Sequence, residues 1–206
     1  MRSAGAVRLT IVSCISANWQ KALPVLAAVG AVVWIALFRD DPLSERALFA
    51  ALLVIYFFHQ IEEHLWPGGF RQFADAHIFH SGNDNWPVDM GGTALVNIGY
   101  VWLPIGLAAL FPETLRWLGL AWIGLTLING IIHVAAGMAL RIYNPGLVTG
   151  LVLFIPFTVF VLVHEVARGA LSGAEVALIA LLGVVLHVPA GGLFVISFLR
   201  RRRTKA

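Results

Sequence analysis

A short polar segment, residues 59–64 with the sequence HQIEEH, ends one of the most apolar stretches of this chain. Two histidines and two carboxylates within six positions could bind a metal ion or transfer protons. Ionisable side chains are costly inside a membrane-spanning helix and usually mark a functional site. Residues three and four apart share a helix face, so His59 lies beside both Glu62 and Glu63, which point roughly 100° apart. We therefore expect these three residues at the centre of a site, with His64 as a reserve ligand.

The composition of the chain indicates the environment of this segment. Of its 206 residues, 59% are hydrophobic and 12% are charged, whereas a soluble domain carries roughly 25% charged residues. The mean hydropathy is +0.85. These values predict a single integral membrane domain. Cys14 is the only cysteine, which excludes an intrachain disulfide and a thiolate cluster.

Six stretches are apolar and long enough to cross a bilayer, which takes about 17–25 helical residues. They are about 22–38, 46–66, 91–111, 113–140, 145–167 and 174–199. With both termini in the cytoplasm, ten of the 14 Lys and Arg residues lie inside, as the positive-inside rule requires. The sequence thus predicts an all-α, polytopic membrane helix bundle of about six transmembrane helices with both termini in the cytoplasm.

The two ends of the chain flank this bundle. Residues 1–21 form an N-terminal segment, and we expect its first twenty residues to form a short amphipathic segment on the inner surface. Residues 200–206 form a basic tail, which we interpret as a topology anchor beside an apolar segment rather than as a nucleic-acid site.

Polar residues from three spans reach a common depth. At about 1.5 Å per residue, His59 lies about 10 Å, Asn97 about 9 Å and His133 about 12 Å from the inner ends of their helices. Asn129 lies one turn before His133, and Gly130 would let another helix approach closely. Apolar helices have no need to carry polar residues at the same depth. We therefore expect one shared site in the cytoplasmic half of the bundle.

Four polar side chains around this depth are candidates to bind a substrate. Asn97 and Asn129 would orient ligands or substrate, and Tyr56 lies one turn before His59 on the same face. Tyr143 ends the helix that carries His133 and would lie at the mouth of the cavity.

Three further histidines are reserve candidates. His77 and His80 lie in the longest loop, about 67–90, at a spacing that would allow a shared metal ion if the loop is helical. The alternative interpretation is a solvated loop with ordinary histidines. His187 lies in the middle of the last span, where it would either bond within the bundle or line the cavity.

The motifs resemble the HXXEE family of bacterial multi-span membrane proteins. Residues 59–63 match the motif of that name, residues 129–133 match a second element, NXXXH, and Pro145-Gly146 match a third. The elements occur in the family's order and cover about 47–150 of this chain. The resemblance implies a multi-span protein of a bacterial inner (plasma) membrane with enzymatic or metal-linked activity. It implies no substrate or reaction.

The first functional hypothesis is a membrane metalloenzyme. Imidazole and carboxylate groups suit zinc, iron or manganese. His59, Glu62 and His133 would be the ligands, with Glu63 as a base or second carboxylate, since catalytic zinc sites use three protein ligands and a water. The chain lacks the HExxH motif of zinc proteases, and the order of its motif reverses the Glu-x-x-His of di-iron bundles.

Other hypotheses remain open. The paired glutamates could act as metal-free acid–base catalysts of an isomerisation or a terpene cyclisation, with His59 or His133 as partner. A proton-coupled carrier is a third possibility, although no internal repeat is evident. A purely structural hydrogen-bonded cluster is the fourth. For an enzyme, we expect the partners to be the lipid bilayer and an apolar or amphiphilic small-molecule substrate, and not a nucleic acid.

Overall fold

The fold is all-α, as predicted, in this computed structural model, which describes residues 18–79 and 90–203. Within those ranges the chain forms helices, turns and short connections and no strand. His80, the N-terminal segment before residue 18 and the last three residues of the basic tail lie outside the described part.

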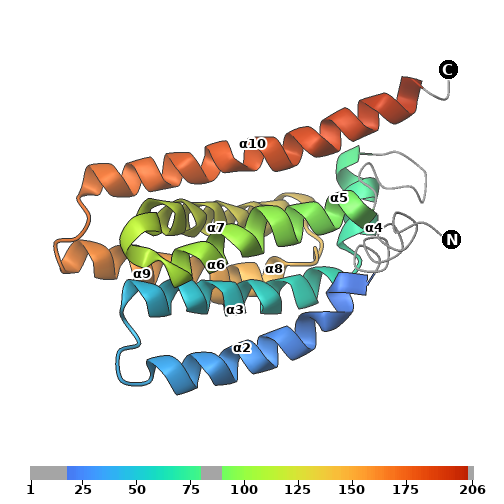
Figure 1. Ribbon diagram of the computed structural model, residues 1–206. Helices are drawn as coiled ribbons and strands as arrows, with labels where there is room; N and C mark the ends of the chain where they lie inside the picture. The colour runs from blue at the N-terminus through green and yellow to red at the C-terminus, as the bar shows by residue number, and fades with distance from the viewer. Residues whose placement is uncertain (1–17, 80–89, 204–206) are drawn as a thin grey trace, which may run out of the picture.

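The helices form a bundle of long, roughly parallel and antiparallel rods (Figure 1). In chain order they are η1 (Trp19–Ala22), α2 (Leu23–Phe38), α3 (Glu45–His64), α4 (Phe70–Ala74), η2 (Asp75–Phe79), α5 (Met90–Ala94), η3 (Leu95–Trp102), α6 (Leu103–Leu110), α7 (Pro112–Leu140), α8 (Leu147–Thr149), η4 (Gly150–Phe154), α9 (Ile155–Ala167) and α10 (Gly173–Arg203). Several follow one another without a break, so that α5, η3 and α6 make one rod, and α8, η4 and α9 make another.

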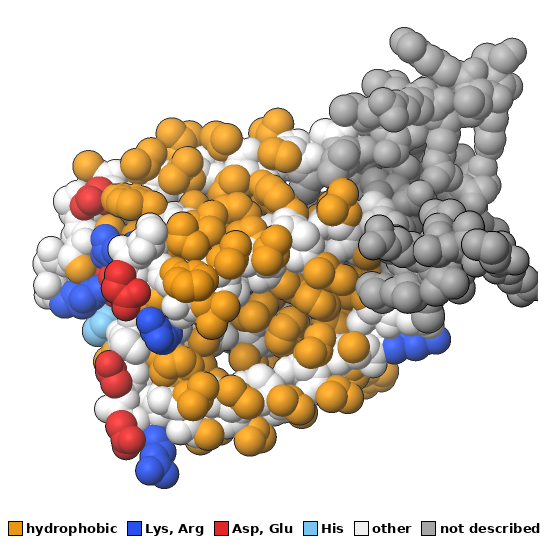
Figure 2. Space-filling model, viewed as in Figure 1, with side chains coloured by type: hydrophobic (Ala, Val, Ile, Leu, Met, Phe, Trp, Pro, Cys, Tyr) orange, Lys and Arg blue, Asp and Glu red, His pale blue; other side chains and the backbone are white. Residues whose placement is uncertain are grey.

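Four helical stretches in the described residues are long and apolar enough to cross a membrane. They are Trp19–Phe38, Gly91–Leu110, Pro112–Leu140 and Leu147–Ala167. Hydrophobic side chains cover the visible face, and charged side chains gather at the end formed by the α2–α3, α6–α7 and α9–α10 connections (Figure 2). That α3 and α10 also cross, making six spans, stays a prediction, as does the cytoplasmic location of the termini. The start of α2 and the end of α10 lie at the same end of the bundle (Figure 1).

Helix α3 occupies the middle of the bundle and carries much of the core. Leu48, Phe49, Leu52 and Tyr56 on one of its faces are buried and pack in the main hydrophobic cluster with α6, α7 and η4. Ser44 caps the start of the helix, its hydroxyl oxygen accepting a hydrogen bond from a backbone N–H of the first turn. The polar segment 59–64 therefore forms the last turns of a rod that is fixed by packing and by its cap.

An ionic network fixes the opposite end of α3. Arg116 on α7 donates hydrogen bonds to Glu45 at 2.6 Å and to Glu165 on α9 at 2.9 Å. Arg168 donates to the same two carboxylates, at 2.6 Å in each case. Glu165 is only 1% exposed. The network ties three helices together, which helps to set the position of α3 relative to α7.

Two prolines inside the rods, Pro104 and Pro156, follow π-helical turns. η3 ends two residues before Pro104, and η4 ends two residues before Pro156. Proline has no N–H for the carbonyl four residues earlier, and Trp122 Nε1 donates at 2.9 Å to that carbonyl of Tyr100. Such π turns are frequent at functional sites, and η3 carries Asn97.

Close contact between α7 and the α8–η4 region brings His133 to the site. A Cβ atom at Gly130 would lie 3.1 Å from the carbonyl oxygen of Gly150, so the expectation of close approach at Gly130 is confirmed. After α7 the chain returns through Gly146, whose φ of 101° favours glycine. A Cβ there would lie 2.7 Å from His133 Nδ1. The glycine at position 146 makes room for the imidazole of His133, and the glycine at position 130 lets the backbone of Gly150 approach α7.

Candidate metal site

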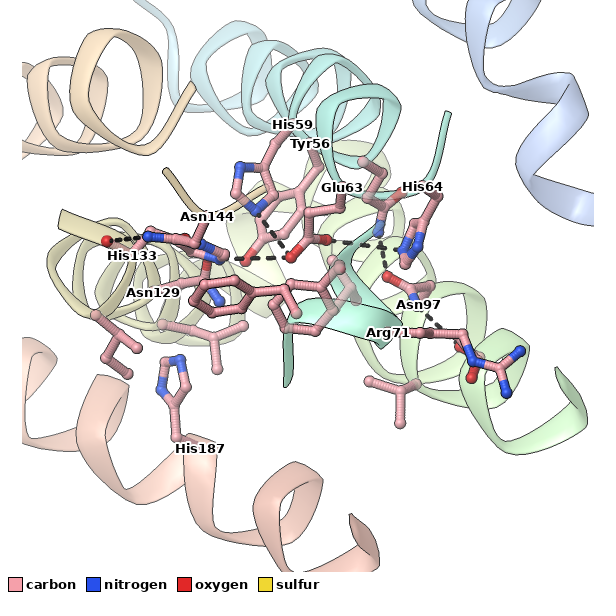
Figure 3. A pocket seen from close by; sticks show the side chains of 18 of the residues that line it. Tyr56, His59, Glu63, His64, Arg71, Asn97, Asn129, His133, Asn144 and His187 are labelled. Atoms are coloured by element: carbon pink, nitrogen blue, oxygen red, sulfur yellow. Dashed lines mark hydrogen bonds and ion pairs between the residues drawn. The ribbon is translucent and has the colours of Figure 1, made fainter. Parts of the chain in front are cut away.

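Three buried side chains from α3 and α7 converge at the centre of the site. His59, Glu63 and His133 are 1%, 8% and 5% exposed. The Nε2 atoms of His59 and His133 lie 3.5 and 3.4 Å from the same oxygen, Glu63 Oε1. One ligand atom from each residue lies within 4.8 Å of the other two. Figure 3 shows the three side chains pointing toward one another.

The hydrogen bonds of Thr149 determine which nitrogen of neutral His59 carries the proton. The hydroxyl of Thr149 lies 2.8 Å from His59 Nδ1 and also bonds to Glu62 Oε2. A carboxylate only accepts, and a hydroxyl has one hydrogen. Thr149 therefore donates to Glu62 and accepts from His59 Nδ1–H. The lone pair of Nε2 then faces Glu63.

Asn144 holds His133 in the same tautomer. Its amide nitrogen donates to the carbonyl of His133 at 2.9 Å, so its Oδ1, 2.7 Å from His133 Nδ1, is the acceptor. The proton of neutral His133 is therefore on Nδ1, and the Nε2 lone pair also faces Glu63. Sequence reasoning singled out neither Asn144 nor Thr149 as a site residue.

Glu62 lies outside the ligand group and binds the start of α8. Its Oε1 accepts from the Tyr143 hydroxyl at 2.8 Å and from Val148 N at 3.0 Å. Its Oε2 accepts from Thr149 N at 2.7 Å and from the Thr149 hydroxyl. These four donors fill the usual acceptor capacity of a carboxylate. They include backbone N–H groups that have no partner within the helix.

Tyr143 contacts Glu62 rather than the cavity to which we assigned it. It lies between α7 and α8, and its hydroxyl donates to Glu62. Burial, with the hydrogen bond to the Glu62 carboxylate, raises the pKa of Tyr143 above the ordinary value of a phenol. Tyr143 thus remains a protonated donor and helps to hold Glu62 in place.

The reserve histidines differ in their proximity to the site. His64 Nε2 lies 3.7 Å from Glu63 Oε2, and its ring contacts that of Trp19 edge-on at 5.0 Å. His77 is exposed on η2 and packs against Phe73, with ring centroids 4.9 Å apart. His64 therefore borders the ligand group, and His77 lies away from it.

A cavity of about 390 Å³ adjoins His59, Glu63 and His133. This volume lies in the usual range for small-molecule sites. Tyr56, Asn97 and Asn129, three of the four predicted substrate contacts, line it. Much of the remaining lining is apolar, namely Phe70, Phe73, Ile78, Val96, Val101, Leu125, Ile132 and Ala136.

Asn97 is held in the wall of this cavity by residues that the motif analysis did not single out. Gln60 Nε2 donates to Asn97 Oδ1 at 2.6 Å, and Trp102 Nε1 donates to Gln60 Oε1 at 2.7 Å. Asn97 Nδ2 donates to the carbonyl of Thr93 at 2.9 Å. Gln60 is 1% exposed. The sequence feature that could have indicated this part of the cavity wall is Gln60, a glutamine inside an otherwise apolar helix.

The fold and the site define an all-α bundle of the membrane type with a buried two-histidine, one-carboxylate cluster. The sequence model of a family described as "Protein of unknown function with HXXEE motif" matches residues 50–161. This match covers more than half of the chain, which therefore belongs to the HXXEE family. No curated protein and no solved structure matches the chain.

Proposed function

We propose that the protein is a membrane enzyme that holds a divalent metal ion through His59, Glu63 and His133. The observation that carries this proposal is the convergence of three acceptors. Two imidazole lone pairs and a carboxylate oxygen face one another, because Thr149 and Asn144 hold the ring protons on the far side. A cation between these atoms would offset the cost of burying them together.

The two separations between the histidine nitrogens and the Glu63 oxygen support coordination. At tetrahedral metal–ligand distances of about 2.0–2.2 Å, neighbouring ligand atoms lie about 3.3–3.6 Å apart. The observed 3.5 and 3.4 Å agree with this spacing. They exceed the length of a charge-assisted N–H···O hydrogen bond, about 2.7–2.9 Å.

The donor set narrows the choice of metal. Two histidines and a glutamate form one type of catalytic zinc site, in which a water takes the open position. Two histidines and a carboxylate also form the ligand set of non-haem iron(II) oxygenases. Zinc would favour hydrolysis or polarisation of a carbonyl, and iron would favour oxidation. Manganese is the third candidate.

In this proposal Glu62 is a positioning residue. It accepts from Thr149, which accepts from His59 Nδ1. Groups that bind the far nitrogen of a ligating histidine fix its tautomer and orientation, and their loss typically reduces metal affinity 10–100-fold. The two adjacent glutamates thus have different roles, one as ligand and one as support.

The substrate in this proposal is a lipid-soluble or amphiphilic small molecule. Much of the lining of the cavity beside the ligands is apolar, and hydrophobic side chains cover the face of the bundle seen in Figure 2. A molecule dissolved in the bilayer could therefore reach the metal without crossing a charged surface.

Elemental mass spectrometry of protein purified in mild detergent without a histidine tag tests the proposal. We expect stoichiometric zinc, iron or manganese in the wild type, and its loss in His59→Ala and Glu63→Gln. His77→Ala is the matched control and should retain the metal, because His77 is exposed outside the cavity. A wild-type protein that stays metal-free after reconstitution would refute the proposal and favour acid–base catalysis.

A further inference from the structure

A second cavity, of about 210 Å³, adjoins the larger cavity beside the proposed metal ligands. Five residues line both cavities, namely Glu63, His64, Phe70, Arg71 and Thr93. The rest of the second lining comes from η1 and from the chain around the start of α4, namely Trp19, Gln20, Gly69 and Gln72. The shared residues show that the two cavities are adjacent, and one of the proposed metal ligands borders both.

The two cavities differ in depth and in chemistry. The start of α2, the end of α3, α4 and α5 lie at one end of the bundle (Figure 1), and their neighbourhood contains the smaller cavity. The larger cavity extends to Tyr56, eight residues before His64 and therefore about 12 Å farther along α3. Much of its lining is apolar, whereas polar side chains such as Gln72 and Arg71 line the smaller one. A molecule that fills both cavities would have a polar group near the end of the bundle and a hydrocarbon body inside.

Trp19 provides a hydrogen-bond donor at the smaller cavity. The side chain is 6% exposed, and its buried Nε1 has no hydrogen-bond partner among the described residues. An indole N–H only donates, and a buried donor without an acceptor is costly. The ring lies edge-on to that of His64, with centroids 5.0 Å apart, and so lies beside the residue that follows Glu63. An acceptor oxygen of a ligand in this cavity would remove the cost.

The charges around the two cavities favour an anion. Among the described residues of the two linings, the acidic and basic side chains are Glu63 and Arg71, whose formal charges cancel. The divalent metal ion proposed above would leave a net positive charge, which attracts an anion and repels an ammonium group. A guanidinium group can bind a phosphate or a carboxylate through two parallel N–H···O hydrogen bonds. Figure 3 shows Arg71 on the side of the site where His64 lies, away from His187.

We propose that the two cavities together bind an amphiphile with an anionic head group, a phosphate or a carboxylate. The head group accepts hydrogen bonds from Arg71 and from Trp19 Nε1–H in the smaller cavity, and the hydrocarbon chain fills the larger one. This inference rests on the proposed function, since it assigns the substrate class of that site and includes the charge of its metal ion. Because Glu63 borders both cavities, the metal ion would lie near the junction of head group and chain.

Photolabelling of the full-length protein in a non-ionic detergent tests the assignment. The probes are 12-carbon chains with a mid-chain diazirine that end in a phosphate, a carboxylate, a hydroxyl or a trimethylammonium group. We expect at least one anionic probe to label peptides from α7 and η3 about tenfold more than the alcohol, because hydrogen bonds to charged groups are the stronger ones. The ammonium probe should label these peptides least. The comparison uses the wild-type protein and so does not depend on how any variant folds.

Variants then assign the preference to the two donors. In Trp19→Phe and Arg71→Gln we expect the anion-to-alcohol labelling ratio to fall by about threefold or more, because each loses a donor to the head group. Labelling by the alcohol should not change, which shows that the larger cavity is intact. The matched controls are Trp117→Phe and Arg39→Gln, since both side chains are exposed and line neither cavity. They should keep the wild-type ratio.

An excess of inorganic phosphate distinguishes a head group from a free anion. At a concentration equal to that of the alkyl phosphate, inorganic phosphate should leave the labelling unchanged, because it lacks the chain that the larger cavity binds. Complete displacement at that concentration would identify a site for free phosphate and overturn the amphiphile assignment.

The remaining outcomes separate this inference from the proposed function. Equal labelling by anions and alcohol, strongest labelling by the ammonium probe, or an unchanged ratio in both Trp19→Phe and Arg71→Gln would overturn the assigned head-group site. Metal content measured on the same wild-type samples tests the metal site independently. Metal-loaded protein that prefers neither anionic probe refutes the substrate class alone.

Discussion

Replacing Glu62 with glutamine tests the positioning role assigned to this residue. Each carboxylate oxygen of Glu62 faces one backbone N–H of α8, that of Val148 or of Thr149. A glutamine in either orientation directs its NH2 group at one of these N–H groups. The substitution therefore leaves one buried donor without an acceptor and removes the negative charge from the helix start.

The expected losses of stability and of metal affinity follow from these lost interactions. An unsatisfied buried N–H costs about 1–3 kcal/mol, and the missing charge at a helix N-terminus adds about 0.3–1 kcal/mol. If the new NH2 group faces Thr149, the hydroxyl can donate to His59 Nδ1 and reverse the tautomer of His59. A proton would then lie on Nε2, where the metal binds. We expect a 10–100-fold loss of metal affinity, equivalent to about 1.4–2.8 kcal/mol.

Zinc affinity by competition with a chromophoric chelator measures this effect, and nitrogen-15 NMR of labelled histidine reports the tautomer. Glu113→Gln is the matched control, because Glu113 is 78% exposed at the other end of the bundle. Its affinity should equal that of the wild type. Wild-type affinity and an unchanged His59 tautomer in Glu62→Gln would refute the reasoning.

The other predictions concern stability and metal removal. Gly146→Ala should weaken zinc binding at least tenfold and lower the melting temperature. The φ of Gly146 is 101°, and the new Cβ would overlap the His133 ring. An unchanged zinc affinity and melting temperature would contradict the close packing of Gly146 against His133. Arg116→Leu should destabilise the fold by about 3 kcal/mol in denaturant unfolding, since Glu165 is buried and loses one partner; a smaller change than that of an exposed Arg39→Leu control would contradict this. Removing metal with a chelator should lower the melting temperature of the wild type. The free energy of unfolding should fall by about 2.7 kcal/mol if the free metal concentration was 100 times the dissociation constant. The chelator should have no effect on His59→Ala, and an equal effect on both proteins would exclude this site as its target.

The helical class could be predicted from the sequence because apolar runs separated by Pro and Gly are strong signals. The depth argument grouped His59, Asn97 and His133, and the structure places all three on the same cavity. That agreement depends only on the rise per residue and on the direction of each helix. Neither quantity requires knowledge of side-chain packing.

The rotation of α3 could not be predicted. Glu62 and Glu63 point about 100° apart on any helix, and a single sequence does not show which one faces α7. In the structure Glu63 faces His133, and Glu62 faces α8. The sequence hypothesis named Glu62 as a ligand and Glu63 as a base or second carboxylate, whereas the geometry favours Glu63 as the ligand.

The groups that orient the histidines also escaped prediction. Asn144 precedes a Pro-Gly pair, where asparagine is an ordinary turn residue, and Thr149 lies in an apolar helix, where threonine is common. Their roles arise from contacts across the bundle with His133 and His59. Such contacts leave no local pattern in the sequence.

X-ray absorption spectroscopy of the metal-loaded protein tests the central claim most directly. The account predicts a first shell of nitrogen and oxygen atoms at about 2.0–2.2 Å for zinc, with scattering from two imidazoles. The His133→Ala protein should show one imidazole or no bound metal. A bound metal with no imidazole scattering, or a wild-type spectrum unchanged by His133→Ala, would contradict the assignment of His59, Glu63 and His133 as ligands.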